Sequence, residues 1–303
     1  MEIWRIFNTL SIITSTLILN SALKRLNINL SLSYLILYTG TVAFMQATII
    51  ALSTGQTSIV MYLGVSLVVY AAIAGRKITL AIGFALILLK PQIGVPLMVA
   101  FLPFKKHHLS IFYASILTFL FALPGMLSIG PITTVTSFLN GLSHHSEFVT
   151  NIGSNSTGLR NFIYTFLDFD ISSNVATFAA VAIAAGTGYY FSRQIKTTPK
   201  HLISKTQSLF FMSAIAGVCF FAPLHEYDLI ILAPVLLLAT TESLRFQYLI
   251  YFAFLTNIRP DNLAQIMGPS SIDERRYYTA VFATCALFTI LALLLAKIRQ
   301  AAD

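Results

Sequence analysis

The fold is decided by residues 78–104, ITLAIGFALILLKPQIGVPLMVAFLPF. This stretch is apolar except near its middle, where Lys90 is followed at once by Pro91. The arms of about 12 to 14 residues on either side rise about 1.5 Å per residue, so each crosses only about two-thirds of a hydrocarbon core roughly 30 Å thick. Proline removes a backbone donor and interrupts a helix. We therefore predict a re-entrant hairpin with Lys90 at its apex.

The rest of the chain is also unusually apolar. Of 303 residues, 56% are hydrophobic and 10% are charged, against roughly a quarter charged in soluble domains. Apolar stretches near 20 residues recur throughout, so we predict an all-α, polytopic transmembrane helical bundle in a single integral membrane domain, 1–303, with about nine spans besides the hairpin. The predicted spans are 3–22, 30–52, 56–74, 109–129, 173–191, 206–222, 227–243, 245–257 and 277–297.

The net charge of +8 comes from basic residues that cluster at the ends of apolar runs. Cytoplasmic loops of membrane proteins carry this bias, so we expect a multi-pass protein of the cell inner (plasma) membrane and no nucleic-acid partner. Arg76 with Lys77 precedes the hairpin, and Lys105 with Lys106 follows it. Both pairs face the cytoplasm only if the hairpin returns to its own side. Counting crossings then predicts an outside N-terminus and an inside C-terminus.

Lys90 is the sharpest single signal. A charge deep in the membrane costs about 2.5 to 3.5 kcal/mol and is tolerated mainly where it meets water, a partner or an anion. The interrupted helix leaves backbone groups around Gln92 able to line a polar cavity. An anionic lipid phosphate suits this ammonium. The alternative is that Lys90 only extends to the outer headgroups.

A second polar constellation lies where one predicted span ends and the next begins: Pro223, His225, Glu226, Tyr227 and Asp228. Its position places an imidazole and two carboxylates at a helix N-terminus on the predicted outer face. Capping by one acid is worth about 1 kcal/mol, and it does not explain both acids with a histidine beside them. We therefore expect a functional site here, with Glu226 and Asp228 as catalytic candidates.

Two weaker signals lie on the same predicted face. Gly55 has no side chain, so a ligand can approach the backbone closely there. The side-chain amide of the next residue, Gln56, can bind a hydroxyl-rich ligand. Arg259 belongs to a charged group with Asp261, Arg275 and Arg276. This group either binds phosphate or pairs internally with Asp273 and Glu274.

Metal and redox chemistry are not indicated. His144 and His145 are adjacent in a polar stretch with Glu147 and lack the i,i+4 spacing of a helical zinc site, so solvated side chains are the favoured interpretation. Cys219 and Cys285 each lie inside an apolar run, which favours neither a disulfide framework nor a metal site. We expect no metal and no cofactor.

Several motifs follow one another in an order that resembles glycosyltransferase family 87. They are Gly55-Gln56, Gly75-Arg76-Lys77, Leu89-Lys90-Pro91-Gln92-Ile93-Gly94, Ser137-Phe138-Leu139, and Pro223-Leu224-His225-Glu226-Tyr227-Asp228-Leu229 with Pro234. The likeness runs from about Trp4 to the last predicted span. It implies the GT-C fold and similarity to polyprenyl-phosphate-mannose-dependent mannosyltransferases.

The resemblance implies transfer of a mannose-like hexose, with inversion, from a polyprenyl-phosphate sugar to a lipid or glycan acceptor on the outer face of the membrane. Its partners are then the lipid-linked sugar, the acceptor and membrane lipids. By position, Lys90 and Gln92 lie near the donor phosphate. Residues His225, Glu226, Tyr227 and Asp228 line the sugar or acceptor cavity.

One departure from the family pattern bears on activity. Members usually begin with a further span and a first outer loop that carries the acidic residue taken as catalytic base, whereas this sequence starts after that point. Glu226 or Asp228 would have to substitute. Two alternatives to an active transferase therefore stay open: a transporter or flippase of lipid-linked sugar, and a noncatalytic, truncated paralogue that binds it.

Overall fold

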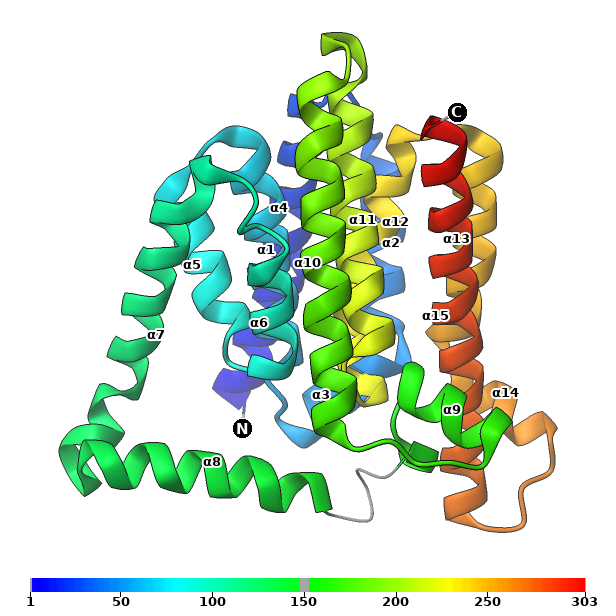
Figure 1. Cartoon of the computed structure of the whole chain (residues 1–303). Helices are drawn as coiled ribbons and strands as arrows, with labels where there is room; N and C mark the ends of the chain where they lie inside the picture. Colours follow the sequence, from blue (N-terminus) through cyan, green and yellow to red (C-terminus); the bar gives the residue numbers. More distant parts are fainter. Residues whose placement is uncertain (1, 148–152, 303) are drawn as a thin grey trace.

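The computed structural model describes residues 2–147 and 153–302, and every regular element within them is a helix (Figure 1). The α-helices are α1 (Glu2–Arg25), α2 (Leu32–Phe44), α3 (Gln46–Thr54), α4 (Ser58–Ala74), α5 (Lys77–Ile87), α6 (Pro91–Val99), α7 (His108–Ile129), α8 (Pro131–Glu147), α9 (Leu159–Leu167), α10 (Ser173–Thr197), α11 (Ile203–Phe221), α12 (Ala233–Leu238), α13 (Leu244–Ile258), α14 (Pro260–Ile266) and α15 (Ile272–Ala302). Short 3-10 helices are η1 (Lys105–His107), η3 (Gly153–Asn155), η4 (Lys200–Leu202), η5 (Glu226–Leu232) and η6 (Ala239–Thr241).

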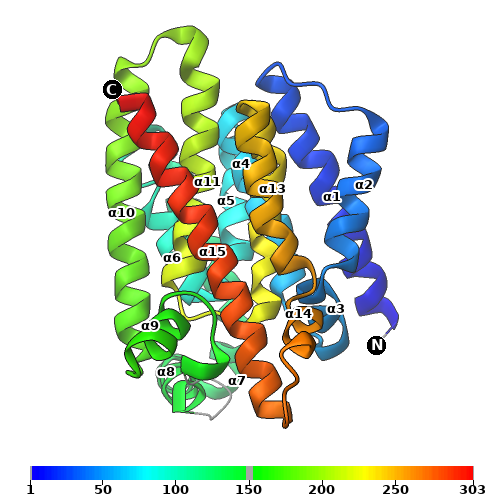
Figure 2. The ribbon, with the colours of Figure 1, turned by 90° about the vertical axis from the view of Figure 1, so that its right-hand side faces the viewer.

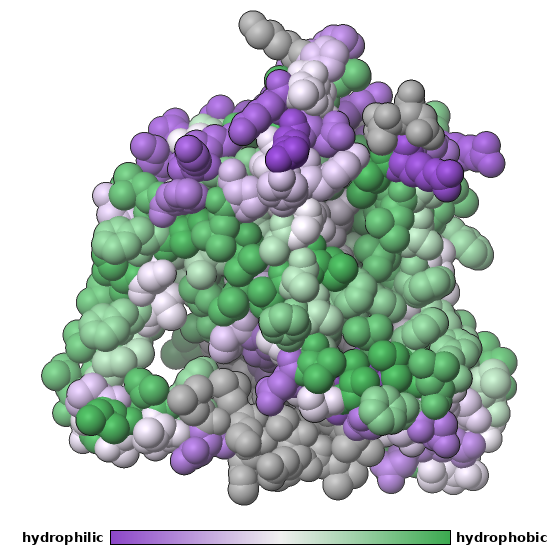
Figure 3. All heavy atoms as spheres, in the orientation of Figure 1, coloured by the Kyte–Doolittle hydropathy of each residue, from purple (hydrophilic) through white to green (hydrophobic). Residues whose placement is uncertain are grey.

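Five of the described helices are long and apolar enough to cross a membrane, namely α1, α10, α11, α15 and α7 together with η1. A sixth crossing results if α2 and α3, which are bent by 54° at Met45, form one span. Apolar side chains form a broad band around the bundle (Figure 3). The all-α, polytopic membrane fold is thus confirmed. The other predicted spans correspond to the shorter α4, the stretch η5–η6, and α13.

The hairpin follows the sequence prediction closely. Helix α5 ends at Ile87 and α6 begins at Pro91, with Lys90 in extended conformation as the N-cap. The two helices run in opposite directions, so the hairpin returns to the end of the bundle from which it enters (Figure 1). The turn is tight, since a Cβ on Gly94 would lie 2.7 Å from the carbonyl oxygen of Ile87. This close packing fixes the position of Lys90 within the turn.

The basic clusters gather at one end of the bundle, here called the basic end. Figures 1 and 2 place there the end of α1, the α4–α5 and α10–α11 turns, the starts of α7 and α13, and the C-terminal end of α15. These segments carry Lys24, Arg25, Arg76, Lys77, Lys105, Lys106, Arg193, Lys205, Arg245, Lys297 and Arg299. Helices α3, α8, α9 and α14 lie at the opposite end. The basic residues just named therefore share a side, as the charge argument requires, whereas Arg259, Arg275 and Arg276, next to α14 and in the first turn of α15, lie at the opposite end.

The predicted span 227–243 runs from the end of the bundle that holds Glu226 to the basic end, which holds Glu242, but it is not one regular α-helix. Two 3-10 helices, η5 and η6, flank the six residues of α12. Pro234 stands at the start of α12, where it cannot supply a helical N–H. Residues 228–239 are all buried in the protein. The stretch is apolar on every side because it forms the core of the bundle, not because it faces lipid.

The connection 130–172 contains two helices. Its first part is α8, which lies across the end of the bundle (Figure 1), and α9 follows further along. Pro131 suits a first helical turn, and Ile132, Val135 and Phe138 follow at helical spacing with exposed side chains. The predicted solvated side chains of His144, His145 and Glu147 lie outside the part that the structure describes.

Candidate functional site

Lys90 and Asp228 form an ion pair between the hairpin turn and η5. The Lys90 Nζ lies 2.5 Å from Asp228 Oδ1, and the two side chains are 13% and 1% exposed. Ser58, the first residue of α4, donates from its Oγ to the same Oδ1 at 2.7 Å and accepts from Lys90 at 3.3 Å. Asp228 Oδ2 accepts from the backbone N–H of His225 at 3.4 Å. Both oxygens of the Asp228 carboxylate therefore accept hydrogen bonds from groups within the protein.

Aromatic rings cover this ion pair. The Tyr227 ring centroid lies 4.6 Å from Lys90 Nζ, a cation–π distance. The His225 ring stacks on Tyr227 with centroids 5.2 Å apart and planes 26° apart. Lys90 thus has a protein partner on each side, which accounts for a charge at membrane depth without a bound anion.

Glu226 has a different environment, although it lies only two residues from Asp228. Its Oε2 accepts a hydrogen bond from Gln46 Nε2 at 3.1 Å. Gln46 lies at the start of α3, and its own Oε1 accepts the backbone N–H of Asp261 at 3.0 Å. Because the Asp261 N–H is always a donor, it fixes the orientation of the Gln46 amide, whose NH₂ group must point to Glu226.

The environment of Glu226 favours its protonated form. Burial, and after it the negative charge of Asp261, raise the pKa of the Glu226 carboxyl to about 7, while Arg276 and the Gln46 hydrogen bond oppose this rise. A carboxyl with a pKa near neutral pH exchanges protons readily there, which is the property required of a general base or acid.

Glu226 faces a cavity of about 460 Å³, here called the Glu226 cavity. Its lining combines one end of α3, η5 and the segment before it, and the start of α15. The lining residues are Gln46, Ile50, Thr157, His225, Glu226, Tyr227, Asp261, Ile272, Arg275, Arg276, Thr279 and Ala280. The cavity therefore combines carboxyl, imidazole, hydroxyl and guanidinium groups. Such groups can bind the hydroxyls and the phosphate of a polar ligand.

The two arginines of this cavity are bound differently. Arg275 makes a bidentate ion pair with Asp261, and their side chains are 40% and 29% exposed. Arg276 contacts Asp273 only loosely, at 3.8 Å, and its side chain is 59% exposed. Arg275 is thus paired internally, but with Asp261 and not with the expected Asp273 or Glu274. Only Arg276 contacts a predicted partner, Asp273, and its guanidinium keeps donors available to a ligand.

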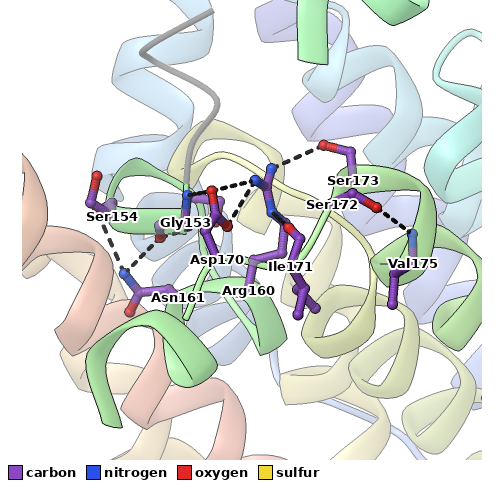
Figure 4. Close-up of polar contacts among 10 residues, drawn as sticks. Gly153, Ser154, Arg160, Asn161, Asp170, Ile171, Ser172, Ser173 and Val175 are labelled. Carbon is purple, nitrogen blue, oxygen red and sulfur yellow. Dashed lines mark hydrogen bonds and ion pairs between the residues drawn. The ribbon is translucent and has the colours of Figure 1, made fainter. Parts of the chain in front are cut away.

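Polar contacts hold together the segment from η3 to the start of α10 (Figure 4). Buried Arg160 donates to both oxygens of Asp170 at 3.0 Å and to the Ile171 carbonyl oxygen at 2.8 Å. Thr157, which lines the cavity, donates its N–H to the Leu224 carbonyl oxygen at 2.8 Å. The connection after α8 is thus tied to the segment that carries Glu226.

The structure brings some of the predicted site residues together and leaves others apart. His225, Glu226 and Tyr227 line the Glu226 cavity, and Asp228 with Lys90 lies directly behind them. Four predicted residues are not among the lining residues: Gly55, Gln56, Gln92 and Arg259. Gly55 is instead the left-handed C-cap of α3, with φ of 71°.

Gln46, Ser58, Thr157 and Arg160 were missed from the sequence. Gln46 alone gave a visible signal, because it is an isolated amide inside the apolar run 30–52. The others are ordinary polar residues whose partners lie far along the chain. Within the described residues, no group of three or more His, Cys, Asp or Glu side chains is placed to hold a metal ion.

The structure is thus an all-α membrane bundle with a charged, hydroxyl-bearing cavity at the end opposite the basic end. The family model of glycosyltransferase family 87 matches residues 1–223, and the chain belongs to this family. It is accordingly a membrane glycosyltransferase, which implies a sugar donor and an acceptor. The matched region contains Gln46, Ser58 and Lys90 and ends just before the segment of Glu226. No curated protein and no solved structure matches the chain.

Proposed function

We propose that this glycosyltransferase moves a mannose-like hexose from a polyprenyl-phosphate donor to a lipid or glycan acceptor, on the outer face of the inner (plasma) membrane. The Glu226 cavity is the reaction site. The observation that carries the proposal is the position of Glu226, a carboxyl with a pKa of about 7, in a cavity that also contains the exposed guanidinium of Arg276. Membership of family 87 supports the sugar-transfer chemistry.

In the proposed reaction, a hydroxyl oxygen of the acceptor attacks the anomeric carbon of the donor sugar. The new glycosidic bond forms as the bond between that carbon and the phosphate oxygen breaks. The hydroxyl proton passes to the Glu226 carboxylate, and the electron pair of the broken bond leaves with the polyprenyl phosphate. Attack opposite the leaving group inverts the anomeric centre.

Arg276 is the proposed contact of the departing phosphate. A guanidinium offers two parallel N–H donors to phosphate oxygens. Arg276 has only a loose ion pair within the protein, whereas Arg275 is held by Asp261. Lys90, which the sequence suggested for this role, is held by Asp228 instead. We assign Lys90 to positioning η5, the helix that starts with Glu226, and not to the phosphate.

The transporter alternative needs a polar path from one end of the bundle to the other. Directly behind Glu226, however, the chain runs into Leu229–Ala239, a stretch of apolar residues that are all buried. A transferase needs access from one side only, so this apolar core favours the enzyme over the flippase.

The test is transfer of radiolabelled mannose from polyprenyl-phosphate-mannose to membrane lipids by the purified chain in lipid nanodiscs. We expect transfer by the wild type, its loss in Glu226→Gln, and a raised KM for the donor in Arg276→Gln. Asp168→Asn is the matched control: it also removes a carboxylate, and asparagine tolerates the left-handed backbone there, with φ of 50°. Full activity of Glu226→Gln would exclude Glu226 as the base. No transfer by the wild type, with donor binding retained, would favour a noncatalytic binding protein.

A further inference from the structure

A second cavity, of about 340 Å³, lies at the basic end, far from Glu226. Its walls come from the ends of α10 and α15, η4 and the start of α11, and the residue that follows η6. The lining residues are Tyr190, Phe191, Gln194, Thr197, Thr198, Pro199, Leu202, Lys205, Thr206, Leu209, Glu242, Lys297 and Ile298. A water molecule takes about 30 Å³ of the liquid, so the space holds far more than one water.

The carboxylate of Glu242 is the unusual group of this cavity. Its side chain is only 2% exposed, and Oε2 lies 3.3 Å from Lys297 Nζ. The other oxygen, Oε1, is buried and has no hydrogen-bond partner among the described residues. Buried carboxylate oxygens without a donor are costly. A ligand that carries an N–H donor would satisfy it.

The remaining polar groups of the cavity complement such a ligand. The hydroxyls of Thr197 and Thr198 both donate to the Gln194 carbonyl oxygen, at 3.1 and 2.7 Å, which leaves their lone pairs as acceptors. Lys205 is exposed and has no carboxylate partner in the described part of the chain. The cavity therefore offers acceptors and a carboxylate on the Glu242 side, and an ammonium at Lys205.

The position of the cavity indicates a membrane component. It lies between the ends of α10, α11 and α15, which are all long and apolar enough to span a membrane. Figure 3 shows the apolar band of the bundle giving way to hydrophilic side chains at this level. Leu202, Leu209 and Ile298 add apolar surface to the cavity walls. A lipid headgroup at this height meets polar groups while its chains stay in the apolar band.

We propose that the Glu242 cavity binds the headgroup of a zwitterionic phospholipid that carries a primary ammonium. The ammonium donates to Glu242, and the phosphate pairs with Lys205. This site is independent of the sugar-transfer reaction, because none of its residues lines the Glu226 cavity.

The proposal is tested by adding phosphatidylethanolamine or phosphatidylcholine with identical acyl chains to the delipidated protein and counting bound lipids by native mass spectrometry. The two lipids share the phosphate and the positive charge, but the choline nitrogen has no N–H. We expect phosphatidylethanolamine to bind about tenfold or more tightly, because only its ammonium can donate a charged hydrogen bond to Glu242.

Three variants separate the contributions. Glu242→Gln should remove the preference for phosphatidylethanolamine, and Lys205→Ala should weaken the binding of both lipids. Lys106→Ala, an exposed lysine at the same end but outside the cavity, should change neither. Equal binding of the two lipids to the wild type, or an unchanged preference in Glu242→Gln, would overturn the proposal. So would equally strong competition by soluble phosphoethanolamine, because the ligand would then be a free metabolite. If Glu242→Gln does not fold, the proposal is decided by two other results: the lipid preference of the wild type and the binding of both lipids to Lys205→Ala.

Discussion

The Lys90 ammonium lies 2.5 Å from the carboxylate of Asp228, which is 138 residues further along the chain. This ion pair joins the apex of the re-entrant hairpin to the 3-10 helix that begins with Glu226. Two residues that the sequence offered as separate functional candidates are therefore each other's partners. The pair anchors one side of the proposed reaction site, and of the two candidate catalytic carboxyls only that of Glu226 lines the cavity.

Breaking this ion pair should be costly. We expect Asp228→Asn to lower the free energy of unfolding by about 3 to 5 kcal/mol, because it leaves a largely buried ammonium without its counter-charge. The measurement is thermal unfolding of the detergent-solubilised protein. The double variant Lys90→Met with Asp228→Asn should recover much of the loss, since no buried charge remains unpaired. Equal stability of Asp228→Asn and wild type would mean that the pair does not stabilise the fold.

Glu226 should set the pH dependence of sugar transfer. Its pKa is raised to about 7, chiefly by burial, and a general base acts in its deprotonated form. The rate should therefore rise as the pH increases through about 7 and level off above it. The measurement is the initial rate of transfer between pH 5.5 and 9. A rate that is already maximal at pH 5.5 would assign the base to a carboxyl with an ordinary pKa.

Gln46 should tune this pH profile without taking part in bond making. Its hydrogen bond stabilises the charged form of Glu226 and so lowers the pKa of that carboxyl. In Gln46→Leu the pKa rises, and the increase in rate should move to higher pH, with the rate at high pH largely kept. Gln56→Leu, at a glutamine outside the cavity, is the control and should leave the profile unchanged. A uniform loss of rate at every pH would indicate a structural effect only.

The sequence predicted the features that depend on local chemistry. Lys90 with Pro91 breaks an apolar run in the middle, and basic pairs on both sides require the ends of the hairpin to share a face. By contrast, the sequence does not reveal that the stretch 227–243 crosses the bundle as its buried core, because apolar composition does not distinguish burial in lipid from burial in protein. The pairing of Lys90 with Asp228 and of Gln46 with Glu226 depends on helix packing between distant segments, which a single sequence does not contain.

Two glycines of α10 offer a test of the packing that supports the hairpin. A Cβ on Gly188 would lie 2.1 Å from the carbonyl oxygen of Ala100, at the end of α6, whereas a Cβ on Gly186 would meet nothing within 4 Å. Gly188→Ala should force α10 away from the hairpin and lower the free energy of unfolding by about 1 to 3 kcal/mol or more. Gly186→Ala lies in the same helix and should be neutral or stabilising by up to about 1 kcal/mol, since alanine favours helix. Thermal unfolding of both variants in one detergent gives the comparison. Because the hairpin holds Lys90 against Asp228, Gly188→Ala should also reduce transfer activity, and equal stability of the two variants would contradict the close contact between α10 and α6.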